Sequence, residues 1–280
     1  MASAALLAVS CLDKQPQSAI PQQQAMQTFD DAEQTVTGIY SLLKSGALYS
    51  GHLTILPDLQ TDLVYAVDGY SNTYGSFWLW TIRSTTSEIE SIYAALYQII
   101  ANCNFYLDYI DRVVAATTDD TKLKDLDTYT GEVYAIRALA YSELLKCYCK
   151  AYHPETAKQE LGVVLRTTTL DKQPLPRASL YDSYQQVIRD LERAEELLDE
   201  KNDAYSSAFV TRAMACALHA RVALYMEDWQ SAIDYSTELI ESRNFALSSA
   251  VSYYTNDMTY FDYMWNYDVA TEVIWRIGFT

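Results

Sequence analysis

The segment from Phe209 to Ile240 constrains the fold more than any other part of this 280-residue chain. Its apolar residues recur at steps of three and four, which predicts two successive helices, with a tight turn at Met226-Glu227-Asp228. Asp228 suits the first position before the second helix, because its carboxylate can accept a bond from a free backbone N–H. Small residues let the helices approach, and larger ones form a stripe that we expect to be buried. The small residues are Ala213, Ala217, Ala220 and Ala223, and the larger ones are Leu224, Tyr225, Trp229, Ile233, Leu239 and Ile240.

Such a pair of helices cannot bury its apolar face alone, so neighbouring helices must stack on it. The same periodicity predicts helices at about 30–44, 87–114, 125–148 and 179–200. Ser87 with Glu90 predicts a capping box at the second of these. Arg137-Ala138-Leu139-Ala140 is echoed by Arg212-Ala213-Met214-Ala215, which indicates degenerate repeats. We therefore expect a mainly α fold of degenerate tetratricopeptide-like helical hairpins with long aromatic-rich loop insertions.

Two stretches lack helical periodicity and are rich in aromatic residues, 45–86 and 246–268. Long insertions of this kind in a compact domain are usually functional. After the second stretch, Thr271–Ile277 places Val273, Trp275 and Ile277 at alternate positions, which predicts a strand. We expect the helices to form a scaffold that displays the two stretches.

The charge balance restricts the possible partners. With 20 basic and 37 acidic residues the net charge is -17, so most of the surface should repel a nucleic-acid backbone. Beyond the N-terminus no run of 18 apolar residues occurs, and we expect any membrane contact to be made by a lipid anchor alone. The 24 tyrosines and 5 tryptophans offer flat faces with a polar edge, which suit polar, ring-shaped ligands.

The first residues predict a site of lipid attachment. Leu7-Ala8-Val9-Ser10-Cys11 has the form of a bacterial lipobox, in which the signal is cut before the cysteine and the thiol receives diacylglycerol. The basic start of such a signal is missing, and a frayed apolar N-terminus is the alternative. The expected division is a signal remnant at 1–11, a tether at 12–28, a helical repeat domain at 29–245 and a further region from 246 to 280.

Several segments follow one another in an order that resembles the SusD/RagB family. They are Cys11, Tyr97–Asn104, Gly131–Tyr141, Gly162–Leu165, Pro176–Ser179 leading to Asp190-Leu191, Arg212–Trp229 and Glu272–Trp275. The resemblance covers essentially the whole chain, and Gly131–Tyr141 is its most diagnostic part. Cys149-Lys150 departs from the family, which usually has glycine there.

The resemblance implies a lipid-anchored, cell-surface protein of the outer membrane. Such a protein captures an oligo- or polysaccharide and delivers it to a SusC-like TonB-dependent transporter. Family members are considerably longer, so residues 246–280 are expected to be the truncated start of a C-terminal region. The matching motifs build the helical scaffold, and they carry no ligand residues that can be transferred by position.

Candidate ligand residues therefore come from physical argument. A sugar ring has flat C–H faces and a rim of hydroxyls, so its site needs aromatic platforms beside amides or charged forks. The stretches Tyr65–Trp80 and Tyr253–Tyr267 combine both kinds of side chain. Aromatic residues in general serve packing more often than binding. The best candidates for glycan contact are Tyr70, Tyr74, Trp78 and Trp265.

No catalytic or nucleotide-binding motif is present, and His52, His153 and His219 are isolated, so we expect a binding protein without cofactor or metal. Two alternatives stay open. One is an all-helical glycoside hydrolase, since 37 acids offer many carboxylate pairs. The other is a helical-repeat scaffold that binds a protein or peptide partner. The cysteines have no framework spacing, and Cys103, Cys147 and Cys216 are expected to be unpaired core thiols.

Overall fold

The computed structural model describes residues 25–278, except positions 62, 66, 68, 70 and 72. The lipobox at Cys11 and most of the predicted tether lie outside the described residues. The described chain is mainly helical, as predicted, and none of its helices has the length and apolar character needed to cross a bilayer. The helices are α1 (Phe29–Leu43), α2 (His52–Leu59), α3 (Gly75–Trp78), α4 (Ser87–Ala116), α5 (Asp120–Tyr148), α6 (Leu180–Leu197), α7 (Arg212–Tyr225), α8 (Trp229–Glu241) and α9 (Tyr260–Tyr267), with a 3-10 turn η2 (Glu200–Asn202) and strands β1 (Tyr253–Thr255) and β2 (Met258–Thr259).

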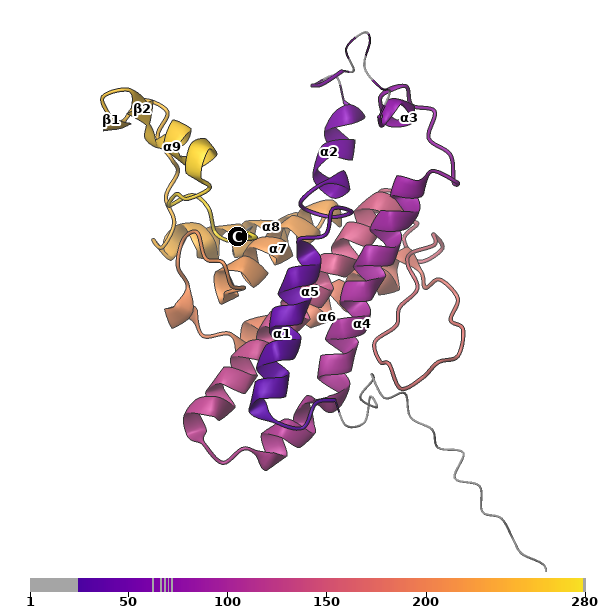
Figure 1. Cartoon of the computed structure of the whole chain (residues 1–280), viewed down its shortest axis with the longest axis vertical. Coiled ribbons are helices and arrows are strands. Elements are labelled where there is room, and N and C mark those ends of the chain that lie inside the picture. Colours follow the sequence, from indigo (N-terminus) through magenta and orange to yellow (C-terminus); the bar gives the residue numbers. More distant parts are fainter. Residues whose placement is uncertain are drawn as a thin grey trace, which may run out of the picture.

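Helix α5 lies at the centre of the bundle and packs against α1, α4, α6 and α7 (Figure 1). Asp119 caps it, because the Asp119 carboxylate accepts hydrogen bonds from the backbone N–H groups of Thr121 and Lys122 at 2.8 and 3.2 Å. The helix therefore begins five residues before the predicted start at Asp125. Burial of apolar side chains between these helices is the main force that holds them together. Fully buried members of this core include Leu96, Ile99, Ile100, Tyr106, Leu126, Ile136 and Tyr141.

A buried ion pair joins α5 to α6. Arg137 donates through Nε and Nη2 to the two carboxylate oxygens of Asp190 at 2.8 and 2.6 Å. Its Nη1 donates to the Asn104 side-chain oxygen on α4 at 2.8 Å, and Gln186 donates to Asp190 at 2.9 Å. Because each charge meets a partner in matched, bidentate geometry, the network fixes the register of three helices at a tolerable desolvation cost.

Two tyrosine hydroxyls hold the extended segment that follows α5 against the bundle. The Tyr97 hydroxyl accepts from Val164 N and donates to Val164 O, both at 3.0 Å. The Tyr141 hydroxyl does the same for Arg166, at 3.0 and 2.7 Å. Each hydroxyl thus satisfies the two backbone groups that a neighbouring strand would otherwise satisfy.

The hairpin of α7 and α8 confirms the predicted turn. Asp228 lies immediately before α8, and its carboxylate accepts from Ser231 N at 3.2 Å. The predicted burial of the large-residue stripe is wrong, because α8 packs only on α7 and has no buried residue within the described chain. The exposed members are Leu224, Tyr225, Trp229, Ile233 and Ile240, which are between 49% and 75% exposed.

The two aromatic-rich stretches contain helices that the sequence did not predict. Within 45–86, the segment His52–Leu59 forms α2 and Gly75–Trp78 forms α3, both too short to show a helical period. Within 246–268, the helix α9 begins with a reciprocal capping box, in which Thr259 and Asp262 bond each other's backbone N–H at 3.1 Å. β1 and β2 form a small antiparallel hairpin before it.

The strand predicted at Thr271–Ile277 does not form. Trp275 makes an isolated parallel bridge with Ser207, and Arg276 N donates to Ser207 O at 2.9 Å. The residues on either side of Ser207 form a turn and a bend, so no ladder continues from this bridge. The capping box predicted at Ser87 is also absent, because the Ser87 hydroxyl donates to Glu88 at 3.0 Å instead.

The described cysteines follow the prediction in part. Cys103 and Cys216 are buried free thiols, as expected. Cys147 is exposed, together with Lys146, because the last turn of α5 reaches the surface there. The prediction of a core position for Cys147 is therefore wrong.

Candidate functional site

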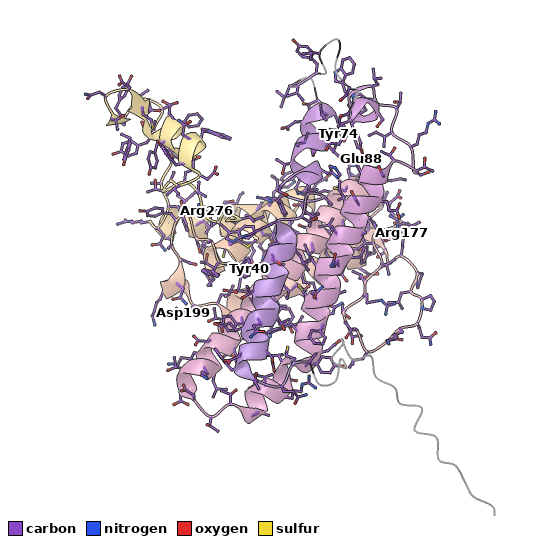
Figure 2. All side chains as sticks on the ribbon, viewed as in Figure 1. Tyr40, Tyr74, Glu88, Arg177, Asp199 and Arg276 are labelled. Carbon is purple, nitrogen blue, oxygen red and sulfur yellow. The ribbon has the colours of Figure 1, made fainter. Side chains whose placement is uncertain are left out.

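The four predicted contact residues lie in different environments. Tyr70 lies outside the described residues. Tyr74, labelled in Figure 2, precedes α3 in the left-handed backbone region, with φ of 61°. Its half-buried ring packs edge-on against His52, with the two ring centroids 5.5 Å apart. Trp78, the last residue of α3, is 38% exposed, whereas Trp265 on α9 is 70% exposed. Trp265 thus offers much the larger free ring surface.

The two aromatic stretches form separate arms on the bundle (Figure 1). α3 packs on α2, which rests on α4, whereas α9 contacts β1 and β2. Within the described chain α3 and α9 do not contact each other. The structure therefore does not join the two predicted stretches into one continuous surface.

A cavity of about 690 Å³ lies between α7 and the segment that follows α9. Trp265 lines it, together with Trp275 and with Tyr49, which lies in the loop before α2 and outside the predicted contact stretch Tyr65–Trp80. Arg221 on α7 and Arg276 line it as well. Sequence reasoning found Trp265 but missed the other four residues. They stand at positions 49, 221, 275 and 276, far apart in the chain for the most part, and they share no local pattern.

The polar groups of this cavity are mostly donors. Trp275 Nε1 is buried and has no hydrogen-bond acceptor among the described residues. Arg221 is exposed, and its guanidinium makes no hydrogen bond or ion pair within the part of the chain that the structure describes. Arg276, labelled at the base of the α9 arm in Figure 2, donates through Nε to Ser206 O at 3.2 Å. A ligand with several acceptor oxygens matches such a lining.

Tyr49 is a rigid part of the cavity wall. Its hydroxyl donates to Glu143 Oε1 at 3.3 Å, and Glu143 pairs with Lys146 at 2.6 Å. Burial, with the negative charge of Glu143 beside it, raises the pKa of Tyr49 well above its usual value. The phenol therefore stays protonated and keeps its hydrogen bond, so the ring is held in place by the bundle.

The cavity also holds two acidic side chains. Asp268 ends α9 in the left-handed region, with φ of 53°, and Glu272 accepts from Ser248 N at 2.8 Å. Carboxylates can accept bonds from ligand hydroxyls, so the lining offers acceptors as well as donors. In the described parts of the chain no group of three or more His, Cys, Asp or Glu side chains is arranged to hold a metal ion.

The arm of α2 and α3 presents a second aromatic surface. Tyr65 and Trp80 are 74% and 71% exposed, and Leu63 and Leu79 are exposed beside them. Trp80 has a positive φ of 55°, which turns the chain sharply after α3. This surface lies apart from the 690 Å³ cavity, whose lining includes none of these four residues.

Comparison with known proteins identifies a family. Residues 11–224 match the SusD-like family described as "Starch-binding associating with outer membrane". Two curated relatives are from Formosa agariphila. SusD-like protein P25 is 22% identical over 96% of this chain and 48% of its own length, and SusD-like protein P38 is 25% identical over 86% of this chain and 43% of its own length. The chain thus spans about half of the length of these relatives.

Solved structures show the same fold. A SusD superfamily protein from Bacteroides fragilis superimposes with a TM-score of 0.70 at 21% identity, over 91% of this chain and 57% of the other. A SusD-like carbohydrate binding protein from Bacteroides vulgatus gives a TM-score of 0.63 at 21% identity, over 80% of this chain and 47% of the other. At this identity the likeness establishes the fold alone.

Proposed function

The chain belongs to the SusD-like family, and on this premise we propose that it binds an oligo- or polysaccharide in the 690 Å³ cavity. The observation that carries the proposal is the combination, in one cavity, of the exposed Trp265 ring with donors that have no acceptor, at Trp275 and Arg221. The family description as starch-binding and the name of the Bacteroides vulgatus protein point to the same ligand class.

The chemistry of the proposed contact is simple. The C–H face of a sugar ring stacks on Trp265, and the ring hydroxyls accept bonds from the guanidinium of Arg221. Tyr49 and Trp275 form the wall behind, where an ordered ligand or water oxygen would satisfy the indole N–H. Tyr74 and Trp78 belong to the arm of α2 and α3. We propose that these two residues, together with Tyr70 of the same sequence stretch, contact a longer chain of the same glycan.

The cellular setting is part of the proposal. The protein is attached to the outer membrane through a lipid on Cys11, with residues 12–28 as tether, and it is exposed at the cell surface. It passes its glycan to a SusC-like TonB-dependent transporter. The family description of outer-membrane association supports this setting.

Binding without catalysis is proposed for the described cavity. Its two carboxylates, Asp268 and Glu272, are accompanied by two arginines, and Glu272 is already bonded to Ser248 N. A hydrolase needs one carboxyl group that stays protonated and a second that stays ionised. An assay of reducing ends tests this, since a binding protein leaves the polysaccharide intact.

The proposed function predicts the effect of removing one ring. A glycan array selects ligands, and isothermal titration with maltoheptaose and the best array ligand measures affinity. Trp265→Ala should lower the affinity by about tenfold, because stacking on an exposed indole contributes on the order of 1–2 kcal/mol. The melting temperature should stay nearly constant, because the ring is 70% exposed.

The matched control is Trp229→Ala on α8, where the indole is 59% exposed and lies outside the cavity. It should change neither affinity nor melting temperature. Equal affinity of Trp265→Ala and the unaltered protein would exclude Trp265 from the site. Release of reducing sugar by the purified protein would favour the hydrolase.

A further inference from the structure

A second cavity, of about 730 Å³, lies between α1, α5 and the segment before α7. Its lining differs from that of the first cavity, and Ile277 alone among the described lining residues borders both. Three aromatic side chains line the second cavity, namely Tyr40, Tyr129 and Phe209. The ring planes of Tyr40 and Phe209 meet at 85° with their centroids 5.8 Å apart, a T-shaped arrangement.

The charged groups of this cavity are mainly acidic. Glu132 on α5 and Glu33 on α1 line it together with one lysine, Lys44. With both carboxylates ionised, the lining carries two negative charges and one positive charge, a net charge of -1. Lys44 makes no ion pair or ring contact within the described residues, so its ammonium does not neutralise either carboxylate directly.

The two carboxylates have fixed positions. Glu33 Oε1 accepts a bond from the Tyr129 hydroxyl at 3.1 Å, which joins one acid to one ring. Glu132 is 5% exposed and bonds the Tyr40 hydroxyl, which in turn accepts from Val210 N at 2.7 Å. The Tyr40 ring, labelled on α1 in Figure 2, is thereby held between the acid and the segment that carries Phe209. The cavity is thus built before any ligand enters.

Aromatic rings around an acidic group attract cations, because the ring faces carry negative electrostatic potential and the carboxylate supplies the counter-charge. A hydrated metal ion fits this lining poorly, since rings cannot replace its oxygen ligands. We propose that this cavity binds an organic ammonium group, with Tyr40, Tyr129 and Phe209 as its walls and Glu132 and Glu33 as its counter-ions.

Binding of an ammonium group should depend on pH. Burial raises the pKa of Glu132 to about 7, against the opposing effect of the bond from Tyr40. The other titratable or charged groups around it are Tyr40 and Glu33 on α1, Lys44 directly after α1, Tyr106 on α4 and Tyr129 on α5. A cation favours the ionised carboxylate, so affinity should rise as the pH rises through about 7 and then level off.

Isothermal titration with choline tests the proposal, and 3,3-dimethyl-1-butanol serves as its uncharged counterpart of the same shape. Choline should bind at least about tenfold more tightly than the alcohol, a difference of the size that cation–π and ion-pair contacts supply. Glu132→Gln should lower choline affinity by about tenfold and flatten its pH profile. Phe209→Ala should also weaken choline binding without unfolding the protein, because Phe209 is 65% exposed.

The control is Glu241→Gln at the exposed end of α8, which should bind choline like the unaltered protein. Two sources can supply the ammonium group, an amino sugar or a lipid headgroup. Glucosamine titrated against N-acetylglucosamine tests the first source, and sedimentation with phosphatidylcholine vesicles tests the second. Binding of either probe that is lost in Glu132→Gln supports the site and identifies its source.

Equal affinity for choline and the alcohol would overturn the proposal. So would choline binding that survives both Glu132→Gln and Phe209→Ala, or the absence of binding by every ammonium probe. These outcomes do not bear on the glycan proposal, because Trp265 and Arg221 belong to the other cavity. Trp265→Ala should leave choline binding unchanged.

Discussion

Tyrosine serves the scaffold of this molecule as much as its surface. The high tyrosine content predicted flat faces for a ligand, yet Tyr97 and Tyr141 bond backbone groups, and Tyr148 donates to Ile89 O at 2.6 Å. Trp265, by contrast, presents most of its ring to solvent. A tyrosine in the sequence does not say whether its hydroxyl will meet a backbone group far away in the chain, so sequence cannot separate the two uses.

The ion pair of Arg137 and Asp190 predicts a large loss of stability. Arg137→Met leaves the Asp190 charge buried and without its main partner, which should lower the free energy of unfolding by about 3–5 kcal/mol. Urea unfolding measures the change. Arg193→Met is the matched control, because the pair of Arg193 with Glu196 is more than half exposed and should contribute at most about 1 kcal/mol. Similar losses in the two variants would contradict the assigned role.

Glu132 predicts a pH dependence of stability. Its pKa is raised to about 7 in the folded protein and is near 4.5 when unfolded, so the folded state holds the proton more tightly. The stabilisation that this tighter proton binding gives the folded state is complete below about pH 4.5 and is lost as the pH rises through about 7. Relative to Glu132→Gln, the protein should lose about 3 kcal/mol of unfolding free energy between these pH values.

Urea unfolding at several pH values, in the absence of any amine buffer, measures this difference. The Glu132→Gln side chain keeps a hydrogen-bonding oxygen for Tyr40 but cannot ionise. A difference between the two proteins that stays constant from acid to alkaline pH would show that Glu132 titrates normally.

At the scale of elements, Gly131 sets the contact between α5 and the end of α6. A Cβ atom at this position would lie 2.8 Å from Leu198 Cγ and 3.2 Å from Leu197 Cβ. Gly131→Ala should therefore destabilise the protein by about 1–3 kcal/mol, although alanine is the better helix former. Gly38→Ala on α1 meets no atom within 4 Å and should stabilise by up to about 1 kcal/mol. Thermal unfolding of both variants checks the prediction, which fails if Gly131→Ala also stabilises.

The long helices could be predicted from the sequence because their apolar stripes repeat over many turns. The starts of α4 and α6 agree with the prediction, whereas α1 and α5 begin earlier than predicted because Thr28 and Asp119 cap them. α2, α3 and α9 have eight residues or fewer, so periodicity had too few repeats to detect. The exposure of α8 depends on which elements pack against it, and no local pattern encodes that.

The candidate site could be predicted only in part for the same reason. Trp265 was recognisable as a tryptophan in an irregular aromatic stretch. Its neighbours in the cavity come from the loop before α2, from α7 and from the segment after α9. Only the packing of the bundle brings these positions together, so sequence reasoning had no signal for Tyr49 or Arg221.

At the scale of the whole molecule, two aromatic arms stand apart on one helical bundle (Figure 1). Under the proposed function, a long glycan would touch both arms, whereas a short one would occupy the cavity beside α9 alone. The exposed apolar row of α8, from Trp229 to Ile240, lies on another part of this surface. Among the described helices and strands, only α7 packs on α8, and the row stays exposed.

The net charge of -17 predicts how the whole molecule responds to salt. Acidic groups repel one another in the compact state, and salt screens that repulsion over about 10 Å at 0.1 M. Raising NaCl from about 10 to about 150 mM should therefore raise the melting temperature by a few degrees. Calorimetry in NaCl and in KCl at equal ionic strength measures it, and a melting temperature that falls with either salt would contradict the prediction.

The hydroxyls of Tyr97 and Tyr141 have a consequence for how ordered this protein is. Burial raises the pKa of both phenols well beyond their usual value, so neither is deprotonated in mildly alkaline solution. The amide hydrogens of Val164 and Arg166 should consequently exchange with solvent deuterium as slowly as those of a sheet. A spectroscopic estimate of helix and strand content would assign Val164 and Arg166 to coil, and it would therefore underestimate the rigid fraction of the chain.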